Sequence, residues 1–358
     1  MRIAFHIAQL GGGGAERVMA LLANHFAAKR DEVYLIANKP CAHEYVLDGA
    51  IHKVYLDGDG EKARGFATRN VSRIRLIRNI CKREKIDCLV SFMAEPNIRS
   101  VISCIGLKTK NIVSVRNDPE KEYPGKMLSC ARAVFSLTSC VVVQTNDAAR
   151  CFKKGNFPIR VIPNPVSDAF YSVSRNPESR RIVSVGRLEP QKNHEMLIDS
   201  FAMIQDFCAG YTLDIFGAGS LEKSLKEKVQ EMGLSDRVLF HGLSQAIDSE
   251  LSDAAAFVMS SDYEGMPNAL MEAMAAAVPV VSTDCPCGGP ADLIDDGRNG
   301  ILISVGATSE MASAVGRLLS DKKFANEIAK NARLTMENYR TQRICDEWER
   351  TIAASLAR

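Results

Sequence analysis

The sequence contains no run of 18 apolar residues, so no segment is long enough to cross a bilayer as a helix. It also shows no long apolar core of a secretory signal, because only a short strand-like stretch, 1–8, precedes the first glycines. Short internal repeats and low-complexity tracts are absent, and 46% hydrophobic with 25% charged residues is ordinary for a globular chain. We therefore expect a cytoplasmic protein, either dissolved or peripheral on the inner face of the cell membrane.

Patterns of metal ligands are also scarce. The 11 cysteines are odd in number and scattered, and several stand in apolar runs, which is typical of reduced, buried thiols. Cys285 and Cys287 lie two residues apart, but no second pair stands at the spacing of a zinc site. We expect no bound metal and no cofactor.

The small net charge of +2 conceals an asymmetry between the two halves of the chain. Residues 1–162 carry 26 Lys/Arg against 15 Asp/Glu, whereas the remainder carries 19 against 28. A basic half suggests a partner that is anionic. Nucleic acid is not the partner we expect, because no aromatic residues are interleaved with these cations.

The chain is long enough for two domains, and its apolar segments alternate between strand and helix patterns. This alternation predicts two α/β, Rossmann-like doubly wound domains with parallel sheets. The expected domains are 1–165 and 181–339, joined by a proline- and serine-rich linker at 166–180, with a helix at 340–358 that is free to pack back on the first domain. We expect strands at 2–7, 32–37, 87–92, 111–115 and 140–144, and then at 181–185, 213–216, 238–240, 256–260 and 278–282.

A glycine run, Gly11–Gly14, directly follows the first expected strand and precedes a helix. Glycine lets the backbone approach an anion closely, and a helix N-terminus offers unpaired N–H groups with a partial positive charge. The run lacks the Lys-Ser/Thr of a P-loop. It is either half of a phosphate site or simply a tight turn.

A second loop, 185–193, follows the first strand of the second half and carries Arg187 and Lys192. Two cations in one loop after a strand can neutralise negative charge that builds up on a leaving diphosphate. The alternative is a pair of solvated surface cations.

A third loop leads into a helix and has an acid on either side of the helix start. Glu264 lies in the loop, and Glu272 lies one to two turns into a helix that begins near Pro267 or Asn268. The helix is otherwise largely apolar, and a buried acid without a partner costs several kcal/mol. We interpret the two acids as acceptors for the hydroxyls of a ligand rather than as one capping acid and one exposed acid.

These loops resemble, in their order along the chain, the motifs of retaining family 4 glycosyltransferases, which have the GT-B fold. The stretch from Glu264 to Glu272 resembles that family's Glu–seven residues–Glu motif. Gly13-Gly14-Ala15-Glu16 is similar to its Gly-Gly-x-Glu loop. The other matching segments are Val185–Asn193, Ile162–Val166 and Phe216–Gly219.

The resemblance implies two Rossmann-like domains that face each other across a cleft, and a transferase that needs no metal; no Asp-x-Asp is placed to hold one. It implies that Glu272 binds the ribose, that Glu264 holds the donor sugar, and that Arg187 and Lys192 take the diphosphate. The catalytic set would be Glu264, Arg187 and Lys192. The donor-binding set would be Gly13, Gly14, Gly217, Gly265, Met266, Pro267, Asn268 and Glu272.

One departure from the family concerns the segment after the strand that ends near Val115. Many members have a His there followed by an acid or amide, whereas this chain has Arg116 and Asn117. Arginine stays protonated and cannot act as a general base. We take both residues as candidates for the acceptor side, where Arg116 would contact an acceptor phosphate or the donor.

The expected partners are a nucleotide sugar and a glycan acceptor, which we expect to be lipid-linked, as for relatives that build surface polysaccharides. The loop after Asp284 resembles that of relatives that use UDP-GalNAc or UDP-galactose, so we expect a UDP-hexose, with GDP-mannose left open. The segment 62–85 reads as a basic amphipathic helix that either meets an anionic membrane surface or is a solvated helix face.

Other classes are compatible with parts of the pattern. A GT-B epimerase or phosphorylase, or a non-catalytic nucleotide-sugar-binding protein, would keep the same loops. A Rossmann dehydrogenase would need an acid near residue 30, a position that Asp31 or Glu32 could fill, but it would not carry two phosphate loops in two domains.

Overall fold

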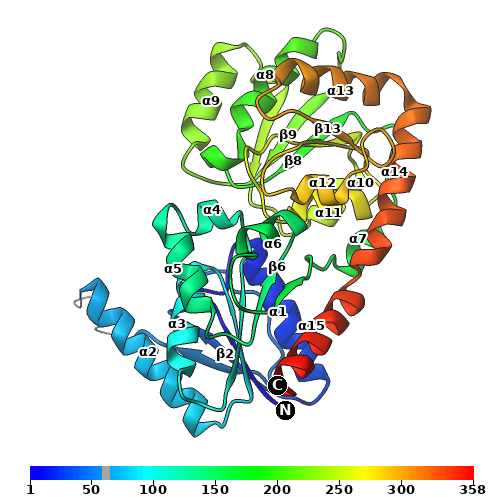
Figure 1. The fold of residues 1–358 in the computed structure, drawn as a ribbon. Helices are drawn as coiled ribbons and strands as arrows, with labels where there is room; N and C mark the ends of the chain where they lie inside the picture. Colours follow the sequence, from blue (N-terminus) through cyan, green and yellow to red (C-terminus); the bar gives the residue numbers. More distant parts are fainter. Residues whose placement is uncertain (59–64) are drawn as a thin grey trace. The chain divides into compact units, whose positions relative to one another are not determined.

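The computed structural model describes residues 1–58 and 65–358. The chain forms two compact units (Figure 1). The first contains Met1–Pro165 together with Gln342–Arg358, and the second contains Val166–Thr341.

The first unit is built on a parallel sheet of seven strands in the order β3-β2-β1-β4-β5-β6-β7. The order reverses between β1 and β4, as in a doubly wound Rossmann sheet. The strands are β1 Arg2–His6, β2 Glu32–Ala37, β3 His52–Tyr55, β4 Cys88–Phe92, β5 Lys110–Ser114, β6 Cys140–Val143 and β7 Ile159–Val161. The helices are α1 Gly14–Ala28, α2 Phe66–Arg83, α3 Ala94–Cys104, α4 Pro119–Glu122, α5 Lys126–Phe135, α6 Asn146–Phe152 and α15 Thr341–Leu356.

Helices cover both faces of this sheet (Figure 1). Because side chains alternate along a strand, β1 sends Ile3 and Phe5 to one face and Ala4 to the other. α1 and α15 cover the first face, where Trp348 of α15 is fully buried and packs against Phe92 with the two rings tilted and their centres 5.6 Å apart. α2 covers the second face. The C-terminal helix therefore belongs to the core of the first unit.

The second unit repeats the arrangement with a parallel sheet in the order β10-β9-β8-β11-β12-β13. One face packs against α8, α9 and α13, and the other against α7, α11 and the C-terminal part of α14. The strands are β8 Arg181–Val185, β9 Thr212–Phe216, β10 Val238–Gly242, β11 Ala256–Met259, β12 Val280–Thr283 and β13 Ile301–Ile303. The helices are α7 Asp168–Tyr171, η2 Pro190–Lys192, α8 His194–Ile204, α9 Glu222–Glu231, α10 Ile247–Ser252, α11 Asn268–Ala275, α12 Gly289–Leu293, α13 Thr308–Ser320, α14 Lys322–Met336 and η3 Glu337–Tyr339.

The predicted doubly wound α/β architecture is confirmed, and the ten expected strands are present with small shifts at their ends. Three further strands, β3, β7 and β13, lie at sheet edges and were not predicted. The segment 166–180, expected as a linker, places Phe170 and Tyr171 in the core of the second unit. Among residues 1–58 and 65–358, no helix is long and apolar enough to span a bilayer.

Candidate functional site

In the second unit, the loop after β8 and the loop after β11 are joined into one structure at the carboxyl edge of the sheet. The backbone N–H of Asp262 donates to Gln191 O at 2.9 Å, and Gln191 Nε2 donates to Tyr263 O at 2.9 Å. Ser260 Oγ donates to Lys192 O at 2.8 Å. The predicted cation loop and the predicted Glu264 loop are therefore one site, because β8 and β11 are neighbours in the sheet.

Lys192 and Glu264 form an ion pair at the centre of these two loops. Lys192 Nζ contacts Glu264 Oε1, and the hydroxyl of Ser261 donates to the same oxygen at 2.7 Å. Glu264 is only 7% exposed. Charges are costly to bury unless they are paired and hydrogen-bonded, and here the arrangement satisfies both conditions. The pair places a cation and a carboxylate in direct contact with each other.

Asn193, the residue after Lys192, fixes the backbone at this point. Its backbone is left-handed, with φ 44° and ψ 51°, a conformation that asparagine tolerates better than most residues. Its Oδ1 accepts the N–H of Met196 at the start of α8, and its Nδ2 donates to Asp262 Oδ1 at 2.8 Å. One side chain therefore caps α8 and ties the cation loop to the acid loop.

A third loop, 284–289, closes over the start of α11. The N–H of Glu264 donates to Pro286 O at 2.6 Å, and the N–H of Cys287 donates to Glu264 O at 2.9 Å. Gly289 lies so close to Gly265 that a Cβ there would overlap the Gly265 carbonyl oxygen. The segment Gly265–Asn268 is thus held from both sides, with Met266 and Pro267 packed inside.

α11 begins at Asn268 and carries Glu272 into the interior. Glu272 is 4% exposed among the buried side chains of α11. At the N-terminus of the helix, Asn268 Oδ1 is buried without a hydrogen-bond partner among the described residues. The expected buried acid on an apolar helix is confirmed. The N-terminus of α11 supplies a partial positive charge on the same loop that holds Glu264.

The turn after β9 is shaped by Gly217, which has φ 149°. A Cβ at this position would overlap the carbonyl oxygen of Gly186. The backbone N–H of Gly217 donates to Gly242 O at 2.7 Å. Gly217 thus has a structural role that its position in the sequence did not reveal: it lets the ends of β8, β9 and β10 meet. Arg187, one residue beyond Gly186, is exposed, and its guanidinium donates to Gln191 Oε1 at 3.3 Å.

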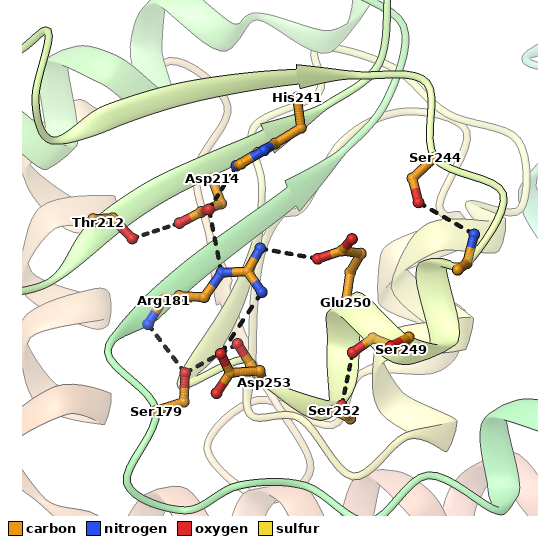
Figure 2. A network of polar contacts seen from close by, with 11 residues as sticks. Ser179, Arg181, Thr212, Asp214, His241, Ser244, Ser249, Glu250, Ser252 and Asp253 are labelled. Carbon is orange, nitrogen blue, oxygen red and sulfur yellow. Dashed lines mark hydrogen bonds and ion pairs between the residues drawn. The ribbon is translucent and has the colours of Figure 1, made fainter.

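A polar network beneath this turn connects the same three strands (Figure 2). Asp214, 2% exposed, accepts hydrogen bonds from His241 Nε2 at 2.6 Å and from Arg181 Nε at 3.2 Å. The His241 ring stacks on Phe216 at 4.6 Å. Arg181 reaches on to Glu250 and Asp253. The network fixes the residues that directly precede Gly217 and Gly242.

The remaining predicted residues lie in the first unit. Gly13 is the N-cap of α1, with no side-chain cap, and Gly14 begins that helix after β1. Arg116 and Asn117 follow β5, and both donate backbone N–H groups to Glu122 Oε2 at 3.0 Å. The role of Gly13 and Gly14 in donor binding stays a prediction.

Within the described parts of the chain, one group of three side chains has the spacing of metal ligands: His25, Asp346 and Glu349. His25 lies in the last turn of α1, at the opposite end of the helix from Gly14. Glu349 is already paired with His25 and Lys29. The prediction that no metal is bound stays a prediction.

Buried His194 makes the second unit sensitive to acid. Burial, and then the charge of Lys192, lower the pKa of the His194 imidazole to about 4, and its Nδ1 lacks a partner among the described residues. Because the unfolded state protonates near the ordinary value of about 6.5, stability is full above that pH and falls as the pH drops towards 4. At pH 5 we expect a loss of about 2 kcal/mol relative to pH 7.

The measurement is urea unfolding of the wild type and of His194→Gln at pH 7 and pH 5. The variant has no imidazole at this position. Between pH 7 and pH 5 its unfolding free energy should therefore fall by about 2 kcal/mol less than that of the wild type. An equal loss in both proteins would show that other groups cause the acid sensitivity.

Two family models match the chain almost end to end. The model described as Glycosyltransferase Family 4 matches residues 12–170, and the model described as Glycosyl transferases group 1 matches residues 168–335. They meet where the first compact unit passes into the second.

Curated relatives and solved structures agree with these models. A Campylobacter jejuni enzyme named GalNAc-alpha-(1->4)-GalNAc-alpha-(1->3)-diNAcBac-PP-undecaprenol alpha-1,4-N-acetyl-D-galactosaminyltransferase is 27% identical over 99% of this chain and 98% of its own. The lipopolysaccharide core biosynthesis glycosyltransferase LpsE of Rhizobium meliloti is 25% identical over 90% and 91%.

The fold also matches two solved glycosyltransferase structures. HepE from Anabaena, solved with UDP and glucose, has a TM-score of 0.84 at 17% identity, covering 99% of both chains. Sucrose-phosphate synthase from Thermosynechococcus elongatus has a TM-score of 0.85 at 17% identity and the same coverage. From the two matching models, the shared motif order and the doubly wound units, the chain belongs to the family 4 glycosyltransferases with the GT-B fold.

Proposed function

We propose that this glycosyltransferase moves a hexose or N-acetylhexosamine from a UDP-sugar to a lipid-linked glycan acceptor, in the synthesis of a bacterial surface polysaccharide or glycoconjugate. We propose further that it retains the anomeric configuration and uses no metal. The observation that carries the proposal is the ion pair of Lys192 with buried Glu264. Glu264 lies in the loop that leads into α11, the helix that contains buried Glu272.

Each residue of this group has a chemical task in the proposed reaction. Lys192 and exposed Arg187 bind the diphosphate and stabilise the charge that develops on it as it leaves. Glu264 accepts hydrogen bonds from the hydroxyls of the donor sugar, and Glu272 accepts them from the two ribose hydroxyls. Met266, Pro267 and Asn268 shape the backbone between these two acids.

The bond changes follow a retaining course. The acceptor oxygen bonds to the anomeric carbon on the face from which the diphosphate departs, and the bond from that carbon to the phosphate oxygen breaks. The acceptor proton passes to the departing diphosphate oxygen. An α-linked donor then gives an α-linked product. Lys192 and Arg187, rather than a metal ion, stabilise the negative charge on the departing diphosphate.

The choice of substrates is supported by the relatives. The Campylobacter jejuni relative is named as an N-acetylgalactosaminyltransferase acting on an undecaprenol diphosphate glycan, and HepE was solved with UDP and glucose. A thermal-shift panel of UDP, GDP, ADP and their sugars tests the donor class, because a ligand that binds only the folded state raises its stability with concentration. We expect the largest shift with UDP compounds. A larger shift with GDP or ADP would overturn the assignment of the base.

We also propose that the first unit meets an anionic membrane surface through the segment 62–85. Residues 62–64 lie outside the described residues. Of the apolar stripe in the sequence, Ile77 and Cys81 are buried against the sheet, so α2 offers the membrane cations rather than a continuous apolar face. Its exposed cations are Arg75, Lys82 and Arg83, with Lys85 just beyond its end.

Each such cation near an anionic leaflet contributes about 1 kcal/mol, so binding should require anionic lipid and weaken with salt. Liposome flotation with neutral and anionic vesicles measures this. We expect Arg75→Glu/Lys82→Glu to abolish the lipid dependence. Equal partitioning of the wild type into both kinds of vesicle would end the proposal.

A further inference from the structure

Side chains from four neighbouring strands converge around Arg116 in the first unit. Phe92 ends β4, Ser114 ends β5, Gln144 follows β6 and Asn164 follows β7, and these strands are adjacent and parallel. The carboxyl edge of such a sheet is where open α/β folds bind ligands. Arg116, two residues past β5, lies at this edge.

The guanidinium of Arg116 is buried and held on several sides. It is 7% exposed and lies over the Phe92 ring, 4.6 Å from its centre. One terminal nitrogen donates to Asn164 Oδ1, which also accepts from Gln144 Nε2 at 2.8 Å, and the other contacts Ser114 Oγ at 3.4 Å. Nε has no hydrogen-bond partner in the part of the chain that the structure describes.

No carboxylate forms an ion pair with this guanidinium among residues 1–58 and 65–358. The nearest candidate, Glu122, uses one carboxylate oxygen to accept the backbone N–H groups of Arg116 and Asn117. Burial raises the pKa of the Glu122 carboxyl to about 7, and the charge of Arg116 opposes that rise. Burial likewise lowers the pKa of Arg116 to about 9.

A cation buried without a counter-ion is costly, and proteins pair or hydrogen-bond such groups. The fork of Nε and a terminal nitrogen matches two oxygens of a phosphate. The groups in contact with the guanidinium, the ring of Phe92 and the amide of Asn164, are neutral, and the Glu122 carboxylate acts on it through space without an ion-pair contact. Among the described residues, the contact that this guanidinium lacks is an acceptor for Nε.

We propose that Arg116 is a phosphate-binding residue of the first unit, which takes an oxygen pair of a substrate phosphate through Nε and a terminal nitrogen. The proposal rests on the proposed function, because the phosphate belongs either to the acceptor's lipid diphosphate or to the nucleotide sugar. The two sources share the same chemistry and are separated by experiment.

The test compares the wild type with Arg116→Gln and Arg116→Lys on two acceptors. One is the glycan linked to a lipid diphosphate, and the other is the same glycan as a neutral alkyl glycoside. If the acceptor supplies the phosphate, Arg116→Gln should raise KM for the diphosphate acceptor about tenfold or more and leave kcat/KM for the neutral one unchanged. If the donor supplies it, KM for the nucleotide sugar and Kd for UDP should rise by that factor with both acceptors.

Arg116→Lys keeps the charge but loses the fork, so its effect should be intermediate. If kcat/KM falls equally with both acceptors while Kd for UDP is unchanged, Arg116 only supports the fold, and the proposal is overturned. Unchanged KM and Kd values in Arg116→Gln would also overturn the proposal. Melting temperatures of the variants separate these outcomes from misfolding.

A binding measurement keeps this inference separate from the proposed function. Inorganic pyrophosphate is titrated by calorimetry into Lys192→Ala and into Lys192→Ala/Arg116→Gln, two variants with the same second unit, so that any difference in binding arises at Arg116. Weaker binding in the double variant supports the anion site even if the wild type transfers sugar to neither acceptor. Equal binding in both variants would overturn it even if transfer is normal.

Discussion

Replacing Lys192 with alanine is expected to lower kcat for sugar transfer by about 10²–10³-fold while changing the affinity for free UDP much less. The reason is that the diphosphate gains charge at the bond that breaks, so a cation placed there is worth more in the transition state than in the bound ground state. Lys192 is suited to this because the backbone around it is fixed by Ser260 and Asn193.

The variant also leaves Glu264 buried without its cation, which should lower the melting temperature. A Lys192→Met variant fills the same space and separates lost packing from lost charge. Lys226→Ala is the matched control, because Lys226 is also paired with a glutamate, Glu222, but on the exposed surface of α9. Normal turnover in a folded Lys192→Ala would remove the diphosphate role of this residue.

The strands and loops that could be predicted from the sequence are those whose signal is local. Buried parallel strands such as β6 and β11 are continuous apolar runs, and the glycines and prolines that follow strands mark the loops. The edge strands β3, β7 and β13 have at least one exposed or half-exposed side and are only three or four residues long. They exist because a neighbouring strand offers hydrogen bonds, which is a tertiary cause.

The same distinction explains which parts of the site were missed. Glu264, Glu272 and Lys192 stand in motifs, so their residue types and spacing indicated chemistry. Asp262 and Ser260 contact residues almost seventy positions away in the sequence: Asp262 accepts from Asn193, and Ser260 donates to the carbonyl of Lys192. No spacing rule reveals such a contact until the sheet order makes β8 and β11 neighbours.

The apolar stripe of α2 illustrates what helical spacing alone leaves open. Its helical spacing was correct, but periodicity reports only that one face is apolar, not what covers it. In the structure Ile77 and Cys81 face the sheet, which is the ordinary use of such a stripe. Arg73 is likewise engaged, through a bidentate pair with Asp57 at 2.8 and 2.6 Å. The proposed membrane binding therefore rests on the cations of this helix that remain exposed.

Replacing Glu272 with alanine is expected to raise Kd for UDP about 10²-fold or more, with a much smaller effect on kcat once the donor is saturating. A buried carboxylate that accepts two hydroxyl hydrogen bonds contributes about 1.5–3 kcal/mol per bond, and both are lost together. Glu272 is 4% exposed, so water cannot readily replace it as the acceptor. Calorimetric titration of UDP measures the change, and Glu227→Ala on exposed α9 is the control.

The decisive comparison uses 2′,3′-dideoxy-UDP, which lacks both hydroxyls that Glu272 should accept. If Glu272 binds the ribose, the wild type loses affinity for this analogue, whereas Glu272→Ala binds it about as well as it binds UDP. The two changes then remove the same hydrogen bonds, and their effects do not add. Fully additive losses would instead mean that Glu272 acts elsewhere, by shaping α11 rather than by touching the nucleotide.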